Sequence, residues 1–282
     1  MPAFDAHIHV QPWWELTPAM LEVMTRGRTD TDQLLQLMKS PEQLLRKLDQ
    51  EGIERAVLVN YPSPDLLGFT ERINDYVAEY CRTDPSRLIA MGGVHPRFTK
   101  DAGAEVRRAA EMGVKAIKVH PPHMGVAANA YLHGLDALGA IYEEAQRLRL
   151  PVMIHTGTSI FPGARSRYGE PMAVDDVAVD FPDLIIVIAH GGRPLWMDQA
   201  FFLVRRFPNV FMDVSSIPPK AVLRYFPRLA EIADQVLYGS DWPGPGVKSM
   251  GANLLDFQAL ELPPDVMRKV LWENACRVFR SS

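Results

Sequence analysis

Short apolar runs alternate with helical patterns along the whole chain. Apolar residues spaced three to four apart predict helices over 101–113, 135–149 and 195–207, with a closing amphipathic helix over 263–279. Another predicted helix begins at the capping sequence SPEQ, 40–43, and ends at Gly52. Eight runs rich in β-branched and other apolar residues predict strands over 3–10, 55–61, 88–95, 116–122, 151–157, 184–192, 210–216 and 236–243. This alternation predicts parallel strands joined by right-handed helical crossovers.

Eight strand–helix units predict an α/β fold of the (β/α)8 TIM-barrel type, formed as one domain over residues 1–282. The alternative is a doubly wound open sheet, which usually has a glycine-rich first turn. The first predicted turn, DAHIHVQPWW over 5–14, has no glycine, and the barrel is therefore favoured. The gap between the first two strands is the longest, so we expect residues 11–40 to form a short insertion over the barrel mouth.

Composition narrows the class of protein. Hydrophobic residues make up 47% of the 282, enough for a large core, and the formal net charge of -4 without a long basic block argues against nucleic acid or an anionic membrane as the partner. No apolar stretch is long enough to span a bilayer, and the first residues lack the pattern of a signal peptide. Cys81 and Cys276 lie far apart and form no CxxC pair, which fits a reducing cytoplasm.

Polar residues recur where the predicted strands end. In a barrel these ends meet on one face, which hosts the active site. Six of the eight histidines fall there, and histidines together with carboxylates are typical of a divalent metal site. In DAHIHV, 5–10, two histidines lie two apart, so a strand would project both rings from one face. The alternative is a pair of hydrogen-bonded core histidines. The strand-end residues are His7, His9, Asn60, His95, Lys118, His120, His155, His190, Asp213 and Asp241.

The motifs DAHIHV, MIHTG, AHGG and GSDWP, with the terminal WENACRVF, resemble the amidohydrolase superfamily in order and strand placement. The most similar branch is the amidohydrolase-related (amidohydrolase 2) group, which includes aminocarboxymuconate semialdehyde decarboxylase and pyrone dicarboxylate lactonase. The resemblance covers essentially the whole chain. It implies the same barrel and a small-molecule substrate, and it leaves a homodimer open.

This resemblance implies a ligand set for one divalent metal, zinc first with manganese as the alternative. His7, His9 and His155 would be ligands, and Asp241 would be a fourth ligand or would accept a hydrogen bond from the metal-bound water. His190 would orient that water or act as general acid and base, so Asp241 and His190 are the expected catalytic residues. Binuclear relatives bridge two metals with a carboxylated lysine on strand 4, which makes a second ion held by a carboxylated Lys118 the less favoured alternative.

Substrate-binding candidates are Lys118, His120 and Arg193. Lys118 could instead pair with Asp213, and His120, like His95, could be satisfied by the backbone. Arginine suits a carboxylate at the barrel mouth. Other interpretations are open for the remaining candidates. Two arginines would bind a carboxylate or lie on the surface, Arg165 and Arg167. We expect His123 and His133 to be solvated, and Asp213 and Ser215 to support the site by hydrogen bonds. Five aromatic residues would line an apolar pocket or pack in the core: Trp13, Trp14, Phe161, Tyr168 and Trp242.

These residues favour a metal-dependent hydrolase, in which a metal-activated water cleaves a C–N, C–O or lactone bond of a small carboxylated or aromatic substrate. The alternative is a metal-dependent lyase, either a non-oxidative decarboxylase or a hydratase of a small unsaturated or aromatic acid. A metal-binding barrel without catalysis, acting as an interaction protein, is a third possibility. It is disfavoured because all five metal-site positions hold competent residues.

Overall fold

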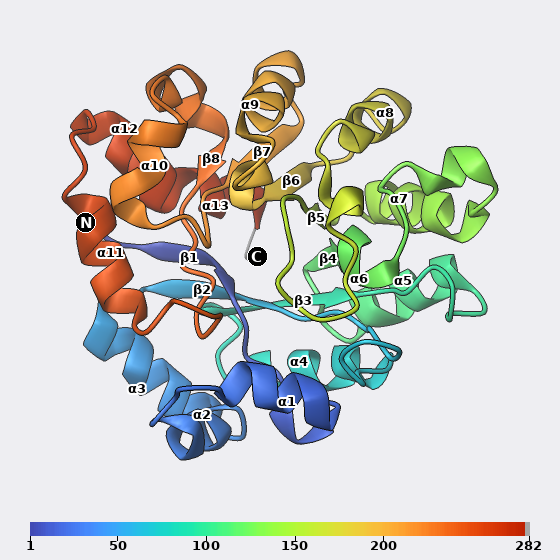
Figure 1. Ribbon diagram of the computed structural model, residues 1–282, viewed down its shortest axis with the longest axis horizontal. Helices are drawn as coiled ribbons and strands as arrows, with labels where there is room; N and C mark the ends of the chain where they lie inside the picture. The colour runs from blue at the N-terminus through green and yellow to red at the C-terminus, as the bar shows by residue number, and fades with distance from the viewer. Residues whose placement is uncertain (280–282) are drawn as a thin grey trace.

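Eight parallel strands surrounded by helices form a barrel in the computed structural model, which describes residues 1–279 (Figure 1). The last three residues of the expected 1–282 domain lie outside the described residues. Each strand pairs with the next in sequence order. The first strand meets the segment directly after the last strand through a parallel bridge between Ile8 and Trp242 and a 2.9 Å hydrogen bond from Ala6 N to Tyr238 O. The (β/α)8 prediction is therefore confirmed.

Each strand lies within a predicted run but is shorter than the prediction. The strands are β1 (Phe4–Ile8), β2 (Arg55–Val59), β3 (Leu88–Gly93), β4 (Ala116–Val119), β5 (Val152–His155), β6 (Ile186–Ala189), β7 (Val210–Asp213) and β8 (Val236–Leu237). The difference is greatest for β8, because the backbone after it turns away from extended geometry and reaches a φ of 67° at Asp241.

Helices follow the strands as predicted. The α-helices are α1 (Pro18–Thr25), α2 (Thr31–Leu37), α3 (Pro41–Glu51), α4 (Arg72–Cys81), α5 (Ala102–Glu111), α6 (Pro121–Met124), α7 (Asp136–Leu148), α8 (Ala173–Asp180), α9 (Met197–Arg206), α10 (Val222–Tyr225), α11 (Met250–Gln258), α12 (Pro264–Arg268) and α13 (Asn274–Val278). The Oγ of Ser40 accepts a hydrogen bond from Gln43 N, and Gly52 ends α3 in the left-handed conformation. The closing helical segment contains a π-helical turn, Lys269–Glu273, between α12 and α13.

Short 3₁₀ helices complete the connections. They are η1 (Trp13–Glu15), η2 (Ala130–His133), η3 (Ser166–Gly169), η4 (His190–Gly192), η5 (Pro219–Ala221) and η6 (Leu229–Gln235). The predicted insertion after the first strand is confirmed as η1, α1 and α2. The hydroxyls of Tyr76 and Tyr80 each donate a 2.6 Å hydrogen bond to a carbonyl oxygen of this insertion, Met38 O and Leu37 O. These bonds attach the insertion to α4.

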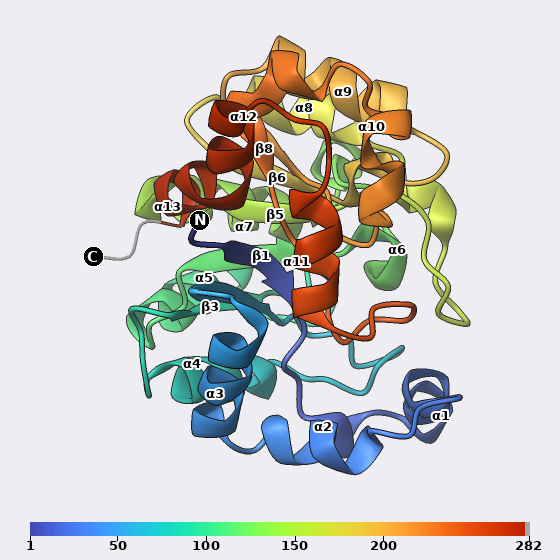
Figure 2. The ribbon, with the colours of Figure 1, turned by 90° about the vertical axis from the view of Figure 1, so that its left-hand side faces the viewer.

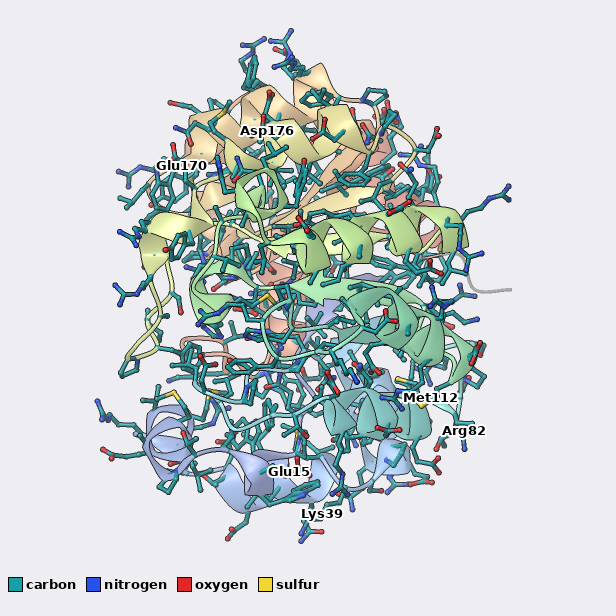
Figure 3. All side chains as sticks on the ribbon, turned by 90° about the vertical axis from the view of Figure 1, so that its right-hand side faces the viewer. Glu15, Lys39, Arg82, Met112, Glu170 and Asp176 are labelled. Atoms are coloured by element: carbon teal, nitrogen blue, oxygen red, sulfur yellow. The ribbon has the colours of Figure 1, made fainter. Side chains whose placement is uncertain are left out.

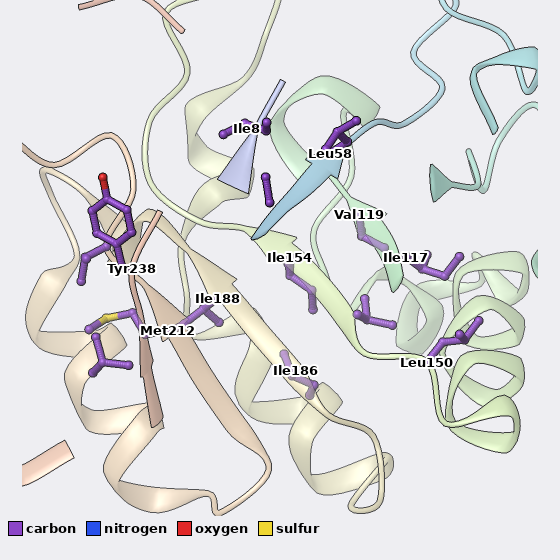
Figure 4. Close-up of a cluster of buried hydrophobic side chains, with 14 of the residues drawn as sticks. Ile8, Leu58, Ile117, Val119, Leu150, Ile154, Ile186, Ile188, Met212 and Tyr238 are labelled. Atoms are coloured by element: carbon purple, nitrogen blue, oxygen red, sulfur yellow. The ribbon is translucent and has the colours of Figure 1, made fainter. Parts of the chain in front are cut away.

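Apolar residues form one layer inside the barrel and another between the strands and the helices. Members of the outer layer, such as Ile154, Ile186 and Ile188, are fully buried (Figure 4). Full burial of such a side chain contributes about 1.5–3 kcal/mol. The inner layer also contacts α13. Its strand residues are Phe4, Ala6, Val57, Val59, Ile89, Met91, Ala116, Met153, Val187, Ala189, Phe211 and Leu237.

The two ends of the barrel differ. The N-terminus and α13 lie on one side, and α1 and α6 lie on the opposite side (Figure 2). Charged side chains such as Lys39 and Arg82 project from the outer surface (Figure 3). Within residues 1–279, no helix is both long and apolar enough to cross a membrane.

Candidate active site

Polar side chains from the carboxyl ends of the strands converge on one cavity of about 360 Å³. The cavity is lined by residues at the carboxyl ends of the strands, on the side towards which the arrow of β1 points in Figure 2. All eight residues predicted to bind metal or substrate or to act in catalysis line it: His7, His9, Lys118, His120, His155, His190, Arg193 and Asp241. The structure thus brings the predicted site together, while the role of each residue stays a prediction.

An irregularity in β1 lets both histidines of DAHIHV reach the cavity. Asp5 pairs with Ala56, whereas Ile8 pairs with Leu58, so β1 has one more residue than β2 between these pairs. Such a β-bulge redirects the side chains that follow it. Phe4 and Ala6 therefore face the barrel core, and both His7 and His9 still face the cavity, with ring centroids 5.0 Å apart.

In three histidines, Nδ1 makes a hydrogen bond with the protein, and Nε2 remains for a ligand in the cavity. The Nδ1 of His7 lies 2.9 Å from Asp213 Oδ2, that of His9 lies 3.0 Å from Val59 O, and that of His190 lies 3.2 Å from Ser215 O. A carbonyl or carboxylate accepts only from a protonated Nδ1, which leaves the lone pair on Nε2. Partners of this kind orient metal-binding histidines in proteins.

His190 and Asp241 both adopt left-handed backbone conformations, with φ of 63° and 67°. This conformation costs a non-glycine residue roughly 1–2 kcal/mol. The surrounding hydrogen bonds hold it in place. His190 N donates to Asp213 Oδ1 at 3.1 Å, and Asp241 N donates to His7 O at 2.8 Å. Strain kept at the ends of two strands of one barrel, β6 and β8, is typical of a functional site.

The cavity contains a group of atoms suited to a divalent metal. Among residues 1–279, His7, His190 and Asp241 each offer a ligand atom within 4.8 Å of the others. The two further ligands that the resemblance implied lie close by, with His9 Nε2 3.1 Å from Asp241 Oδ1 and the rings of His155 and His190 4.7 Å apart.

Unpartnered nitrogens support this fit. The Nε2 atoms of His7 and His155 are buried and have no hydrogen-bond partner in the described part of the chain. A buried polar atom without a partner is costly unless a ligand satisfies it. Nitrogen and carboxylate donors without a thiolate suit zinc or manganese. The residues present therefore fit the metal that the sequence predicts.

Burial determines which groups are charged. It lowers the pKa of Lys118 to about 8, although Asp213 and Asp241 oppose the shift. Burial alone would raise the pKa of Asp213, but the charge and hydrogen bond of His7 and the hydroxyl of Ser215 lower it. The Nζ of Lys118 is buried and has no hydrogen-bond partner within residues 1–279, so the predicted alternative of a direct pair with Asp213 is absent from that part of the chain.

His123 packs against three residues that line the cavity, which differs from its expected position. It was expected to be solvated, but it is buried. Its Nδ1 lies 3.0 Å from the hydroxyl of Tyr61 and its Nε2 lies 2.9 Å from Ser159 Oγ. Its ring stacks on His120 at a centroid distance of 3.6 Å. The HPPH spacing hid this contact because α6, a single helical turn, folds the second histidine back over the first.

Arg193 lines the cavity, and its Nε is a buried donor without a partner in residues 1–279. The other arginine candidates, Arg165 and Arg167, do not line this cavity. Neither does His95, whose Nδ1 accepts a 3.3 Å hydrogen bond from Arg97 N. Of the aromatic candidates, Phe161 lines the cavity, whereas Trp13, Trp14, Tyr168 and Trp242 do not.

The apolar wall comes mainly from residues that the sequence analysis did not single out. The insertion contributes Leu16 and Met24, the segment after β2 contributes Tyr61 and Leu67, and Phe161 follows β5. Apart from Met24, which lies in α1, these residues lie in loops, where no periodic pattern marks them. Together with the unpartnered donors of Lys118 and Arg193, they make a cavity suited to a small ring that carries acidic groups.

Comparisons with known proteins identify the family and the fold. The amidohydrolase family matches residues 4–281. A 2-amino-3-carboxymuconate-6-semialdehyde decarboxylase from Dictyostelium discoideum is 24% identical over 214 residues, which are 66% of this chain and 58% of that protein. This chain thus aligns with little more than half the length of that relative.

Solved structures share the fold. An uncharacterised TIM-barrel protein from Bordetella bronchiseptica has a TM-score of 0.78 at 21% identity, covering 99% of this chain and 98% of the other. The 5-carboxyvanillate decarboxylase from Novosphingobium aromaticivorans, complexed with manganese and 4-hydroxy-3-methoxy-5-nitrobenzoic acid, has a TM-score of 0.70 at 17% identity, with coverages of 99% and 96%.

Proposed function

Because this chain belongs to the amidohydrolase family, we propose that it is a metal-dependent lyase that decarboxylates a small aromatic or unsaturated acid without an oxidant. From the sequence alone, hydrolysis was the favoured reaction and this one the alternative. Two of the similar proteins are named decarboxylases, and one of them holds manganese beside an aromatic acid. These similarities favour the reaction that the sequence analysis placed second.

The observation that carries the proposal is the unpartnered ammonium of Lys118 in a cavity that also holds the candidate metal ligands. A buried cation without a partner is destabilising unless an anion joins it. Arg193 adds a second buried donor at the same cavity. A substrate carboxylate would satisfy both groups, and the apolar wall would receive its ring or alkene.

His7, His9, His155 and Asp241 would hold the metal, with His190 beside them. When bound, a divalent ion supplies a Lewis acid that draws electron density from a coordinated oxygen. Manganese is the first ion to test because of the structural neighbour, and zinc is the alternative from the sequence.

Decarboxylation breaks the bond to the carboxyl carbon, releases CO2 and requires one proton at the carbon left behind. Two groups at the cavity can hold that proton. Burial would raise the pKa of Asp241, but the hydrogen bond of His9 and the charges of His7 and His9 hold it well below its usual range. Burial and Arg193 lower the pKa of His190, so both groups enter the reaction as bases, and the proton that one of them delivers to carbon first comes from solvent water.

Hydrolysis remains the second candidate. The observation that favours it is the pair of unprotonated acceptors, Asp241 and His190 Nε2, beside His7. Such acceptors could take a proton from an attacking water as readily as return one to carbon.

The test is a panel of hydroxybenzoic and carboxybenzoic acids, labelled with ¹³C at the carboxyl carbon, and a matched panel of lactones and amides. The enzyme is loaded with manganese or with zinc, and metal content is measured by elemental analysis. We expect labelled CO2 from at least one acid, loss of this activity in Asp241→Asn, and no loss in Arg165→Ala, which lies outside the cavity. Turnover of lactones or amides alone would refute the lyase and support hydrolysis.

A further inference from the structure

His120 follows β4 and begins the single turn α6. Its Nδ1 accepts a hydrogen bond from His123 N at 3.3 Å, and the same N–H also donates to His120 O at 3.0 Å. A backbone amide can only donate, so Nδ1 must hold a lone pair. The proton of the neutral ring therefore sits on Nε2.

Stacking holds the ring of His120 in this orientation. It lies between the rings of His123, at 3.6 Å and 22°, and His155, at 3.9 Å and 18°. His123 is itself held at both nitrogens, by the hydroxyls of Tyr61 and Ser159. A 180° rotation of the His120 ring, which exchanges its two edges, would break the helix cap and would have to pass through orientations that clash with both stacked rings.

The other edge of the ring faces the cavity. His120 lines the cavity, and its Nε2 makes no hydrogen bond with the described part of the chain. Lys118, two residues earlier on β4, offers a second donor without a partner. Because His155 is a predicted metal ligand and stacks on His120, this pair of donors lies beside the metal site. On this side the cavity offers hydrogen-bond donors from both residues.

We propose that His120 determines substrate specificity by donating its Nε2–H to an oxygen of the substrate that can only accept, such as a carboxylate, carbonyl or phenolate oxygen. The identity of the substrate as a small acid rests on the proposed function, whereas the direction of the hydrogen bond rests on the helix cap. A group that offers only N–H donors would meet a donor here and would be rejected.

Two substitutions test the roles of the two ring nitrogens separately. In His120→Asn, the side-chain oxygen can replace Nδ1 as the helix cap, but the donor to the cavity is lost. In His120→Gln, the longer amide can place an N–H near the position of Nε2, but it is a poor cap. If His120 only caps the helix, His120→Asn should retain more of the wild-type affinity than His120→Gln. If His120 binds the substrate, His120→Gln should retain more.

The first measurement is ¹⁵N NMR of the zinc-loaded protein labelled at histidine, with His120→Asn used for assignment. We expect the neutral tautomer with the proton on Nε2. A proton on Nδ1, or a charged ring at pH 7, would overturn the proposal whatever the enzyme does.

The second measurement is the affinity for 4-hydroxy-3-methoxy-5-nitrobenzoate, the compound held by the structural neighbour. A lost hydrogen bond to a charged group corresponds to roughly 10- to 100-fold weaker binding. We expect that loss in His120→Asn and most of the affinity to return in His120→Gln. Equal affinity of His120→Asn and wild type would overturn the proposal. If the wild type does not bind this probe but has the proton on Nε2, the result counts against the proposed aromatic substrate and still supports His120 as a donor.

Discussion

Replacing Lys118 by methionine should stabilise the metal-free protein and remove its affinity for acids. Methionine has a similar length and carries no charge, so it can fill the same space in the wall of the cavity. The ammonium of Lys118 has no hydrogen-bond partner in the described residues, and its burial is the main reason for the lowered pKa. The wild type therefore sacrifices stability to keep a cation at this position.

The magnitude follows from the shift of the pKa from 10.5 to about 8. At 1.36 kcal/mol for each pKa unit, burying the charged form costs about 3 kcal/mol. Below pH 8 the lysine is charged in both the folded and unfolded states, so the full cost is present. Between pH 8 and 10.5 the folded state has lost a proton that the unfolded state still binds, so wild-type stability rises. Because Asp213 loses a neighbouring cation in the variant, the gain at pH 7 should be about 1–3 kcal/mol.

The assay is urea unfolding of metal-free wild type and Lys118→Met at pH 7 and pH 10.5. We expect the advantage of the variant to shrink by about 3 kcal/mol between these pH values. Lys115→Met is the matched control, because Lys115 is exposed directly before β4. Equal stabilities of Lys118→Met and wild type at pH 7, or a difference that does not change with pH, would refute the reasoning.

Three further predictions concern the support of the site. Asp213→Asn should weaken metal binding roughly 10- to 100-fold because its side chain orients His7, and chelator competition would measure this; an unchanged affinity would contradict the assigned role. Gly239→Ala places a Cβ 2.9 Å from the Cβ of His7, so it should lower the free energy of unfolding by about 1–3 kcal/mol and weaken metal binding. Unchanged thermal unfolding and metal affinity would show that the strand ends can separate without cost. Burial lowers the pKa of His95 from 6.5 to about 4, so this residue destabilises the fold as the pH falls from 6.5 towards 4. His95→Gln should flatten acid unfolding over that window, whereas His133→Gln, at an exposed position, should leave the acid midpoint unchanged.

The strands were predictable because barrel strands are buried on both faces. Runs such as LIIVIA, 184–189, are apolar without alternation, and turn residues or helical patterns bound them. The positions of Lys118, His155 and Asp241 at the cavity followed from topology alone, since parallel strand ends meet on one side. The end of β8 was not predictable, because the left-handed turn at Asp241 leaves no clear mark in GSDWP.

Contacts made through loops could not be predicted. Tyr61 and His123 meet because a loop after β2 and a single helical turn after β4 approach each other, and no periodic pattern encodes that approach. For Trp242 the sequence left open an apolar pocket or packing in the core, and the structure shows the second. This residue follows a catalytic candidate in sequence, but it is buried outside the cavity, in the layer between strands and helices. Neighbours in sequence at a strand end point in different directions, and the sequence does not say which one reaches the substrate.

The bulge in β1 divides that strand into two parts in which substitutions can occur independently. The part before it supplies core residues, Phe4 and Ala6, and the part after it supplies His7 and His9. Substitutions in one part leave the facing of the other unchanged. Without the bulge, regular alternation of the same residues would keep Phe4 and Ala6 on the inner face and would turn both imidazoles towards the surrounding helices. The one extra residue therefore matters more to the position of the imidazoles than the identity of the residues around it.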